Sequence, residues 1–584
     1  MKRKILRRTL SYVSQYWVAL LLCVVSAVVS VGAFLLLPVL VGQVIDQIIG
    51  VGQVDFGAVA VRLRWFLVLL VTAALFQWLM LAQARRISAQ VAQAIRRDAF
   101  ARMHGAPLST LDKHPHGDLV SRLITDAETV SDGLLQAISG LLPGLVTVLV
   151  TMVLMLLLDL RIALLVIVVT PLSILPARFI AAWTRRHFGA QNQVQGEMSA
   201  FVSEIVQNHT PVAAASYEDA AQQAFDTQNA RFFKANVRSM FYSSLANPST
   251  RFVNGLIYAA VAILGALSAI SGVLTVGSLS ALLTYAHQYT RPFNEGASHL
   301  AQLQAARAAL SRLYAVIDWE QEAADLPEAI SPADCGGAVS LHGVSFAYDK
   351  EQPVLADVNL DVLKGAHVAI VGPTGSGKTT LLSLLMRFYD ADTGEIVIDG
   401  TPIEEIKRES LRRLYGMVLQ DSFIRRGTVG ENIAYGRPEA TRAEIEEAAR
   451  AAHVHSFIIG LKHGYDTVIT GDNSLSAGQK QLIGIARIFL AKPAMLLLDE
   501  ATSAIDTRTE ILIQDSLRRL MDGRTSFIVA HRLGTIQGAD VILVMQDGRV
   551  IEQGTHAELL AQKGLYAELY ESQFGNFKLI NDRT

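Results

Sequence analysis

Residues 372–379 have the types and spacing that hold the phosphates of a nucleotide. They read Gly-Pro-Thr-Gly-Ser-Gly-Lys-Thr, follow the apolar run His-Val-Ala-Ile-Val and precede a helix-forming run. Glycines let backbone N–H groups close around phosphates, the lysine reaches the β- and γ-phosphates, and the last threonine hydroxyl can ligate Mg²⁺. The residues predicted to bind nucleotide here are Gly372, Thr374, Gly375, Ser376, Gly377, Lys378, Thr379 and Thr380.

Two adjacent carboxylates form a second candidate for phosphate chemistry. The apolar run 494–498 ends in Asp499 and Glu500, which is typical of a buried strand with acidic side chains at its carboxyl end. Asp499 is suited to hold Mg²⁺ through water, and Glu500 is suited to orient or polarise an attacking water. Together with the loop upstream, the pair predicts hydrolysis of a nucleoside triphosphate.

The segment 475–479, Leu-Ser-Ala-Gly-Gln, has the form of a helix start. Ser476 suits the N-cap position, and the free N–H groups and positive dipole end of a helix attract an anion. On these residues alone, a capped helix with no further role is an equal alternative.

The elements that position these residues follow from composition. Of 584 residues, 51% are hydrophobic and 18% are charged, whereas soluble proteins average about 25% charged residues. Long uncharged runs stop near residue 290, and from about residue 340 short β-branched runs alternate with helical patterns. The chain is therefore predicted to hold a helical membrane half followed by an α/β half.

Charge and cysteine content exclude several other classes. The net charge is −2 and no Lys/Arg-rich tail is present, so nucleic acid is not an expected partner. The two cysteines, Cys23 and Cys335, are far apart in the sequence, so no metal or redox pair is expected.

Six segments qualify as membrane spans, since a span needs about 20 apolar residues. They are 17–45, 67–82, 138–158, 162–183, 253–270 and 278–289. Lysine and arginine collect before the first span, between the second and third, and between the fourth and fifth, which places both termini in the cytoplasm. The two basic connections are long and helix-rich, so they could carry the helices about 35 Å or more into the cytoplasm.

Polar residues inside spans cost free energy in lipid and often mark a substrate pathway. Such residues here are Gln77, Gln83, Arg251, Asn254, His287, Gln288 and Arg291. Hydrogen bonding between helices, or anchoring of a helix end, is the alternative for each of them. The substrate candidates are Gln77, Asn254, His287 and Gln288.

In combination the motifs resemble the ATP-binding cassette of ABC transporters, and the whole chain resembles an exporter-type half-transporter. The resemblance rests on the phosphate loop, on LSAGQ before LLLDE, on Ser-Ala-Ile-Asp at 503–506 and on IVAHRL around His531. It implies an all-α membrane domain of six helices over 1–318, a linker over 319–338, an α/β P-loop cassette over 339–575 and a tail over 576–584. The connections around 100–130 and 212–225 would rest on the cassettes as coupling segments.

The resemblance also assigns residues to roles. The nucleotide contacts that it adds are Tyr348, Ser476, Gly478, Gln479 and Asp506, the catalytic residues are Glu500, His531 and Gln420, and the Mg²⁺ ligands are Thr379, Gln420 and Asp499. Tyr348 would stack on adenine, while Ser476 and Gly478 would bind the γ-phosphate held by the loop of a second cassette. Two departures stand out: alanine replaces the usual glycine at 477, and Thr-Gly-Asp-Asn-Ser at 470–474 replaces a glutamate-containing pattern.

The function that the resemblance implies is ATP-driven transport of a small amphipathic molecule, lipid or peptide by alternating access, in the export direction. A siderophore-type importer and an ATP-gated membrane sensor or channel are the alternatives, whereas the spans exclude a soluble cassette ATPase. The expected cofactors are ATP and Mg²⁺, and the expected location is the inner (plasma) membrane with the cassette in the cytoplasm. A second half-transporter subunit is required, and resemblance to the competent chain of bacterial heterodimeric multidrug exporters favours a heterodimer over a homodimer.

Overall fold

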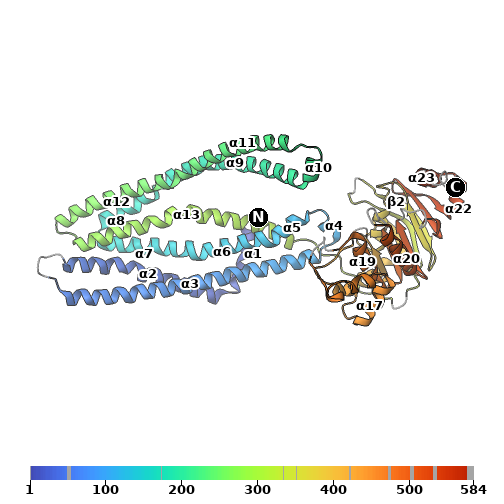
Figure 1. The fold of residues 1–584 in the computed structure, drawn as a ribbon. Coiled ribbons are helices and arrows are strands. Elements are labelled where there is room, and N and C mark those ends of the chain that lie inside the picture. Colours follow the sequence, from blue (N-terminus) through green and yellow to red (C-terminus); the bar gives the residue numbers. More distant parts are fainter. Residues whose placement is uncertain are drawn as a thin grey trace. The chain divides into compact units, whose positions relative to one another are not determined.

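The computed structural model describes residues 2–48, 54–172, 174–332, 335–349, 352–419, 422–470, 475–499, 506–529 and 536–574. The chain divides into two compact units (Figure 1). The first unit contains Met1–His104 and Pro115–Trp319, and the second contains Gly105–His114 and Glu320–Thr584.

The described residues of the first unit form helices joined by short connections. Its elements are α1 (Lys2–Ser14), α2 (Trp17–Ile48), α3 (Phe56–His104), α5 (His116–Ser121), the π-helical turn η1 (Arg122–Asp126), α6 (Ala127–Gln136), the π-helical turn η2 (Ala137–Leu141), α7 (Leu142–Leu158), α8 (Leu160–Leu172), α9 (Ile174–Gln207), α10 (His209–Ala214), α11 (Glu218–Ser244), α12 (Ala246–Ile270) and α13 (Val276–Ile317).

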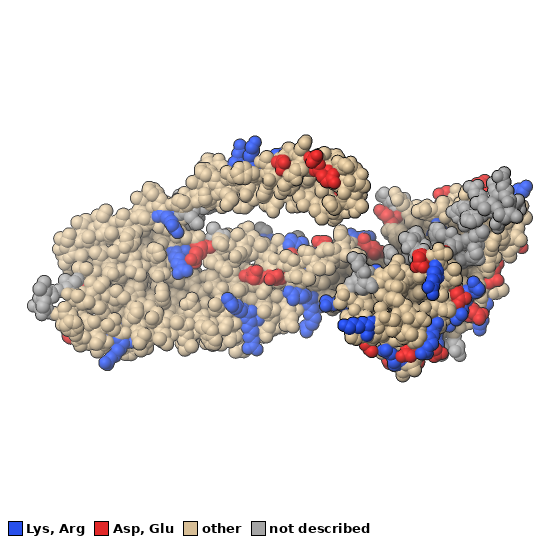
Figure 2. All heavy atoms as spheres, in the orientation of Figure 1, with Lys and Arg blue, Asp and Glu red and all other residues tan. Residues whose placement is uncertain are grey.

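Among the residues that the structure describes, four helical segments are long and apolar enough to cross a membrane, namely Trp17–Ile48, Phe56–His104, His116–Leu158 and Glu218–Ile270. They contain four of the predicted spans. Of the other two predicted spans, 162–183 is divided between α8 and the start of α9, and 278–289 lies within α13; these two crossings stay predictions. Few charged side chains lie over the part of the unit formed by α2, α8 and α12 (Figure 2).

The long helices continue well past their apolar runs. Helix α3 has 49 residues and is therefore about 74 Å long, more than twice the hydrocarbon thickness of about 30 Å. Its apolar part pairs with α2, where the Ser30 hydroxyl donates to the Ala73 carbonyl at 2.9 Å. Farther along the unit, Arg312 of α13 forms a two-pronged ion pair with Asp126 of η1, at 2.7 and 2.5 Å.

One carboxylate ties the C-terminal end of α2 to the N-terminal end of α13. Asp46 accepts a hydrogen bond from the Thr275 hydroxyl and another from the backbone N–H of Gly277, both at 2.7 Å. A Cβ atom on Gly42 would lie 2.4 Å from the Gly277 carbonyl oxygen, so the two backbones are in close contact. We call Asp46, Thr275 and Gly277 the Asp46 latch.

The second unit combines three sheets with helices. Its elements are α4 (Leu108–Leu111), β1 (Val339–Phe346), β2 (Leu355–Val362), β3 (His367–Val371), α14 (Lys378–Leu385), β4 (Thr393–Ile398), β5 (Thr401–Pro402), η3 (Ile403–Glu405), α15 (Arg408–Leu414), β6 (Tyr415–Val418), β7 (Gly427–Thr428), α16 (Val429–Ile433), η4 (Ala434–Gly436), α17 (Arg442–Ala451), α18 (His455–Ile459), η5 (Gly464–Asp466), β8 (Val468–Ile469), α19 (Ala477–Ala491), β9 (Met495–Asp499), α20 (Thr507–Met521), β10 (Thr525–Val529), β11 (Val541–Gln546), β12 (Arg549–Gly554), α22 (His556–Gln562) and α23 (Leu565–Phe574).

A six-stranded sheet of order β12-β11-β3-β10-β9-β6 organises this unit. Strand β10 is parallel to β3 on one side and to β9 on the other, so Val529 faces both Ile370 and Asp499. Alternate residues of these strands enter two different apolar clusters, as both faces of the sheet are covered. A four-stranded antiparallel sheet, β2-β1-β4-β5, and the pair β7-β8 complete the described strands.

The stretch predicted as a linker packs on this unit. Ile330 pairs with Ile406 in an isolated parallel bridge. Glu322 receives an ion pair from Arg412 at 2.5 Å, and its backbone N–H donates to Gly105 at 2.8 Å. Residues 320–332 are therefore held by the cassette in the described structure.

Candidate functional site

The phosphate loop follows β3 directly and leads into α14, as the sequence predicts. Gly377 caps α14 with φ +97°, a conformation that favours glycine, and a Cβ atom there would lie 2.6 Å from the Leu355 side chain. The Ser376 side chain is 2% exposed, and its hydroxyl has no hydrogen-bond partner among the described residues. A buried polar atom without a partner suits a loop built to receive phosphate oxygens.

The Lys378 side chain folds back onto the phosphate loop. Its ammonium group donates to the carbonyls of Gly372 and Pro373, each at 2.8 Å. Burial lowers the pKa of Lys378, while the carboxylate of Asp499 acts in the opposite direction. Because Asp499 ends β9, the two charges meet at the carboxyl edge of the parallel strands, where open α/β sheets bind ligands.

The residues at this edge fit a divalent cation. Thr379 stands exposed on the first turn of α14, and Asp499 supplies a carboxylate beside the loop. A hydroxyl and a carboxylate are oxygen donors of the kind Mg²⁺ takes together with phosphates. Thr379 and Asp499 would hold the ion, which when bound would neutralise charge on the phosphates.

Gln420, Glu500 and His531 lie outside the described residues, as do 471–474 and 503–505 of the flanking motifs. Glu500 is next to Asp499 in the sequence, and the strands β6 and β10 end shortly before Gln420 and His531.

Tyr348 stands beside the loop with half of its surface exposed. Its hydroxyl lies 3.2 Å from that of Thr380, and its ring meets Phe346 and Tyr389 edge to face, each at 5.0 Å. An exposed ring so supported is positioned to stack on a base.

Ser476 caps α19, as predicted. Its hydroxyl accepts from the backbone N–H of Gln479 at 3.2 Å, and the Gln479 side chain accepts from the Ser476 backbone at 2.9 Å, forming a capping box. Asp506 caps α20 by accepting from Thr509 at 3.0 Å, which lowers the pKa of the Asp506 carboxyl. Among the described helices, three others also begin with capping boxes, and these carry glutamate at the third position: Glu431 in α16, Glu444 in α17 and Glu558 in α22.

The phosphate loop and the start of α19 belong to opposite faces of the six-stranded sheet. Leu381 and Leu385 of α14 pack in one apolar cluster, whereas Leu482 and Ile485 of α19 pack in the other. A single chain therefore does not bring Ser476 to its own phosphate loop.

The second unit also contains Gly105–His114, a part of the connection that follows α3. Tyr389, whose ring contacts Tyr348, donates a short hydrogen bond to Asp112, which follows α4. Burial and this carboxylate raise the pKa of Tyr389. The sequence gives no signal for this contact, because its partners are 277 positions apart.

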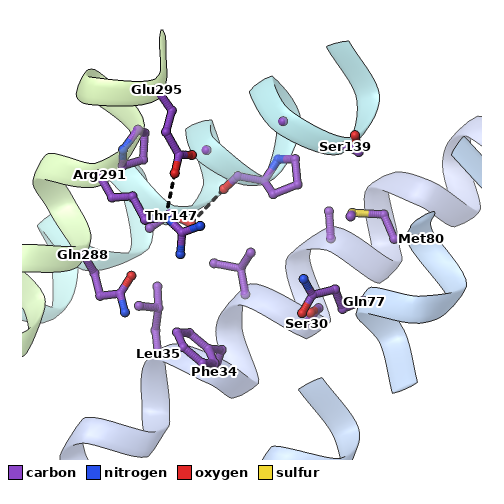
Figure 3. Close-up of a pocket in the computed structure, with 16 residues that line it drawn as sticks. Ser30, Phe34, Leu35, Gln77, Met80, Ser139, Thr147, Gln288, Arg291 and Glu295 are labelled. Atoms are coloured by element: carbon purple, nitrogen blue, oxygen red, sulfur yellow. Dashed lines mark hydrogen bonds and ion pairs between the residues drawn. The ribbon is translucent and has the colours of Figure 1, made fainter. Parts of the chain in front are cut away.

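Two cavities in the first unit bring together the substrate candidates. Cavity A, about 240 Å³, lies among α2, α3, α7 and α13 and is lined by Gln77 and Gln288 (Figure 3). Cavity B, about 550 Å³, lies between α12 and α13 and is lined by Asn254 and His287. Both cavities are also lined by Arg291 and Glu295, so α13 separates them.

Sequence reasoning missed Glu295 as a lining residue. Its carboxylate accepts from Nε of Arg291 at 2.9 Å, one helical turn away. The spacing of four residues between Arg291 and Glu295 could have indicated an ion pair. It was missed because the pair lies just beyond the apolar run that ends at 289.

The chain matches known proteins over both units. Residues 20–293 match the ABC transporter transmembrane region, and residues 355–503 match the ABC transporter family model. The chain is 43% identical to the fatty acid ABC transporter ATP-binding/permease protein of Mycobacterium bovis, over 88% of this chain and 82% of that protein. It is 35% identical to the ATP-dependent lipid A-core flippase of Syntrophus aciditrophicus, over 84% of this chain and 82% of that protein.

A solved structure resembles the whole chain. It is a bacterial Atm1-family ABC exporter with ATP bound, 30% identical, with a TM-score of 0.77 over 97% of this chain and 98% of the other. The expected ATPase activity coupled to export agrees with these relatives. The chain therefore belongs to the ABC transporter family, as an exporter whose transmembrane region and ATPase domain are fused in one polypeptide.

Proposed function

We propose that this exporter moves an amphipathic molecule that carries an acyl chain. The observation that supports this is the mixed apolar and polar lining of cavity A. Phe34, Leu35 and Met80 give it an apolar wall, while Gln77 and Gln288 face it with amide groups (Figure 3). Each buried methylene of an acyl chain contributes about 0.8 kcal/mol, so such a wall favours a lipid-like tail. The names of two relatives, a fatty acid transporter and a lipid A-core flippase, point to the same class.

Hydrolysis is proposed to use the residues at the carboxyl edge of the parallel strands. Lys378 and the loop N–H groups would bind the phosphates, Thr379 and Asp499 would hold Mg²⁺ together with Gln420, and Glu500 would polarise the attacking water. His531 would contact the γ-phosphate. The proximity of Asp499 to Lys378 supports this arrangement.

A dimer is proposed because one chain supplies two half-sites on opposite faces of its sheet. Ser476 and Gly478 of one cassette would complete the phosphate site of the other, with Asp506 at the seam. Likeness to the competent chain of heterodimeric exporters favours a partner of different sequence over a second copy.

The proposed location is the inner membrane with both termini and the cassette in the cytoplasm, supported by the distribution of lysine and arginine. If the chain were a siderophore-type importer or an ATP-gated channel, acyl amphipaths would not accumulate on the side of the membrane opposite the cassettes.

The test is hydrolysis and transport by the chain in lipid vesicles, compared with Glu500→Gln. We expect ATP-dependent movement of a fluorescent acyl amphipath to the side opposite the cassettes, and its loss in the variant. An inert unmodified chain that becomes active with a second subunit identifies a heterodimer. Turnover that survives the substitution refutes the role of Glu500, and hydrolysis without transport of any acyl amphipath refutes the proposed substrate class.

A further inference from the structure

Arg291 and Glu295 form a weak ion pair that lines two cavities. Arg291 lies two residues beyond the apolar run of α13 that ends at 289, and both charged side chains line cavities A and B. Charged side chains that face a cavity next to a membrane span are usually retained for function. An exposed pair spaced i,i+4 stabilises a helix by only about 0.3–0.5 kcal/mol, and arginine preceding glutamate is the less favourable order. Helix stability therefore does not explain these two residues.

The geometry of the pair allows a ligand to replace Glu295 as the partner of Arg291. Only Nε of Arg291 contacts Glu295, at 2.9 Å, and among the described residues the guanidinium has no other hydrogen bond or ion pair. The Arg291 side chain is 64% exposed and that of Glu295 is 48% exposed, so solvent or a ligand can reach both. When displaced, the Glu295 carboxylate has a second partner in reach, since its Oε2 lies 4.0 Å from Nε2 of His299.

The charge around the two cavities favours an anion. Arg291 and Glu295 line both cavities, and Arg251 of α12 also lines cavity B. Two arginines against one glutamate give the lining a formal excess of one positive charge. A guanidinium offers a planar fork of donors that matches a carboxylate or phosphate, so one or both arginines can hold such a group.

One buried polar atom that lines cavity B has no hydrogen-bond partner among the described residues, and one helix carbonyl beside cavity A lacks its usual donor. Oδ1 of Asn254, which lines cavity B, is buried and has no partner among the described residues. Pro292 has no N–H to offer the Gln288 carbonyl one turn earlier, and both residues line cavity A. An unsatisfied buried polar group costs about 1–3 kcal/mol, which a bound head group or its water could recover.

We propose that Arg291 binds the oxyanion head group of the transported amphipath, a carboxylate or a phosphate, in exchange for Glu295. The acyl chain then lies against Phe34, Leu35 and Met80 of cavity A, and Arg251 strengthens the positive field from the side of cavity B. This inference rests on the proposed function and adds head-group selectivity to it. Glu295 keeps Arg291 paired when no substrate is bound and competes with weakly anionic ligands.

The test is competition binding to the full chain in nanodiscs, with tritiated oleate as the probe. Oleate, oleyl phosphate, oleyl alcohol and oleylamine share one chain and differ in head group. We expect the two anions to compete at least about tenfold better than the alcohol, which corresponds to about 1.4 kcal/mol, and oleylamine to compete least. If oleyl phosphate displaces the probe at least about tenfold better than unlabelled oleate does, the head group is a phosphate rather than a carboxylate.

Variants separate head-group binding from a structural role. In Arg291→Gln the preference for oleate over oleyl alcohol should fall by about tenfold, whereas Glu295→Gln should raise it because the internal competitor is gone. Arg307→Gln is the matched control, since Arg307 is an exposed arginine on the same helix outside both cavities. If Arg291→Gln and Glu295→Gln weaken every ligand alike, the pair is structural and the inference is overturned.

Failure of the inference and failure of the proposed function give different results. Saturable binding of all four ligands with equal affinity leaves an acyl-chain transporter standing but removes the role of Arg291. Absence of saturable binding for every acyl ligand removes the proposed substrate class itself.

Discussion

Replacing Asp46 with alanine should shift the exporter toward the state in which the ends of α2 and α13 are apart. The Asp46 latch holds these ends with two hydrogen bonds of 2.7 Å to a carboxylate. Such bonds are worth about 1.5–3 kcal/mol each, and since one of them is exposed we take the lower value for both. The loss of about 3 kcal/mol corresponds to a change of about 100-fold in the ratio of closed to open ends.

The assay is a distance measurement between spin labels on the exposed faces of α2 and α13 next to the latch, without nucleotide and with ATP. We expect Asp46→Ala to populate the long distance at lower ATP concentration. Asp55→Ala is the control, because Asp55 caps its own helix through Ala58 at 3.0 Å and does not join α2 to α13. Gly42→Ala should act in the same direction as Asp46→Ala, since its Cβ atom would meet the opposing backbone at 2.4 Å. Unchanged distances in Asp46→Ala, or an equal shift in the control, would refute the reasoning.

Three further predictions concern the described contacts. The Cys335 thiol donates a hydrogen bond to Asp399 at 3.2 Å, and burial together with this carboxylate raises the pKa of the thiol to about 11. Alkylation at pH 8 should therefore be about 100-fold slower than for an ordinary thiol, should accelerate as pH rises toward 11, and should accelerate at pH 8 in Asp399→Asn. Arg312→Ala leaves Asp126, whose side chain is 9% exposed, without its ion-pair partner. The free energy of unfolding should fall by about 2 kcal/mol, a value discounted because the arginine is half exposed. The Tm in detergent should therefore fall, and an unchanged Tm would contradict this prediction. Tyr389→Phe keeps the ring but removes the hydrogen bond to the α4 segment, so hydrogen exchange should rise in Gly105–His114 and stay constant in α17.

The sequence predicts features that a short stretch of chain determines by itself. The phosphate loop is one, because strand, glycines and helix start all lie within 367–385. The cap at Ser476 is another, since its capping box closes within four residues. Both are local contacts, so no knowledge of distant partners is needed.

Contacts between distant residues and breaks in helical periodicity could not be predicted. The turns η1 and η2 each insert π-helical geometry into the helix that runs from α5 to α7. Each turn changes which side of the helix the later residues lie on, so a search for a repeat of 3.6 residues does not identify the buried face. Helix η2 also contributes Ser139 and Gly140 to cavity A, although neither was a candidate. The pairing of Asp112 with Tyr389 depends on how a connection between two membrane helices folds onto the cassette, which no local rule specifies.

The capping box of α19 differs from the other three in the residue at its third position. Where α16, α17 and α22 use a glutamate, α19 uses the neutral Gln479. A carboxylate near a helix N-terminus stabilises it by about 0.3–1 kcal/mol, so α19 has not been optimised for its own stability. The same carboxylate would repel a phosphate at that end of the helix. Selection for thermal resistance alone should therefore find Gln479→Glu readily and yield a sturdier protein that turns over ATP poorly, a conflict between stability and activity confined to one side chain.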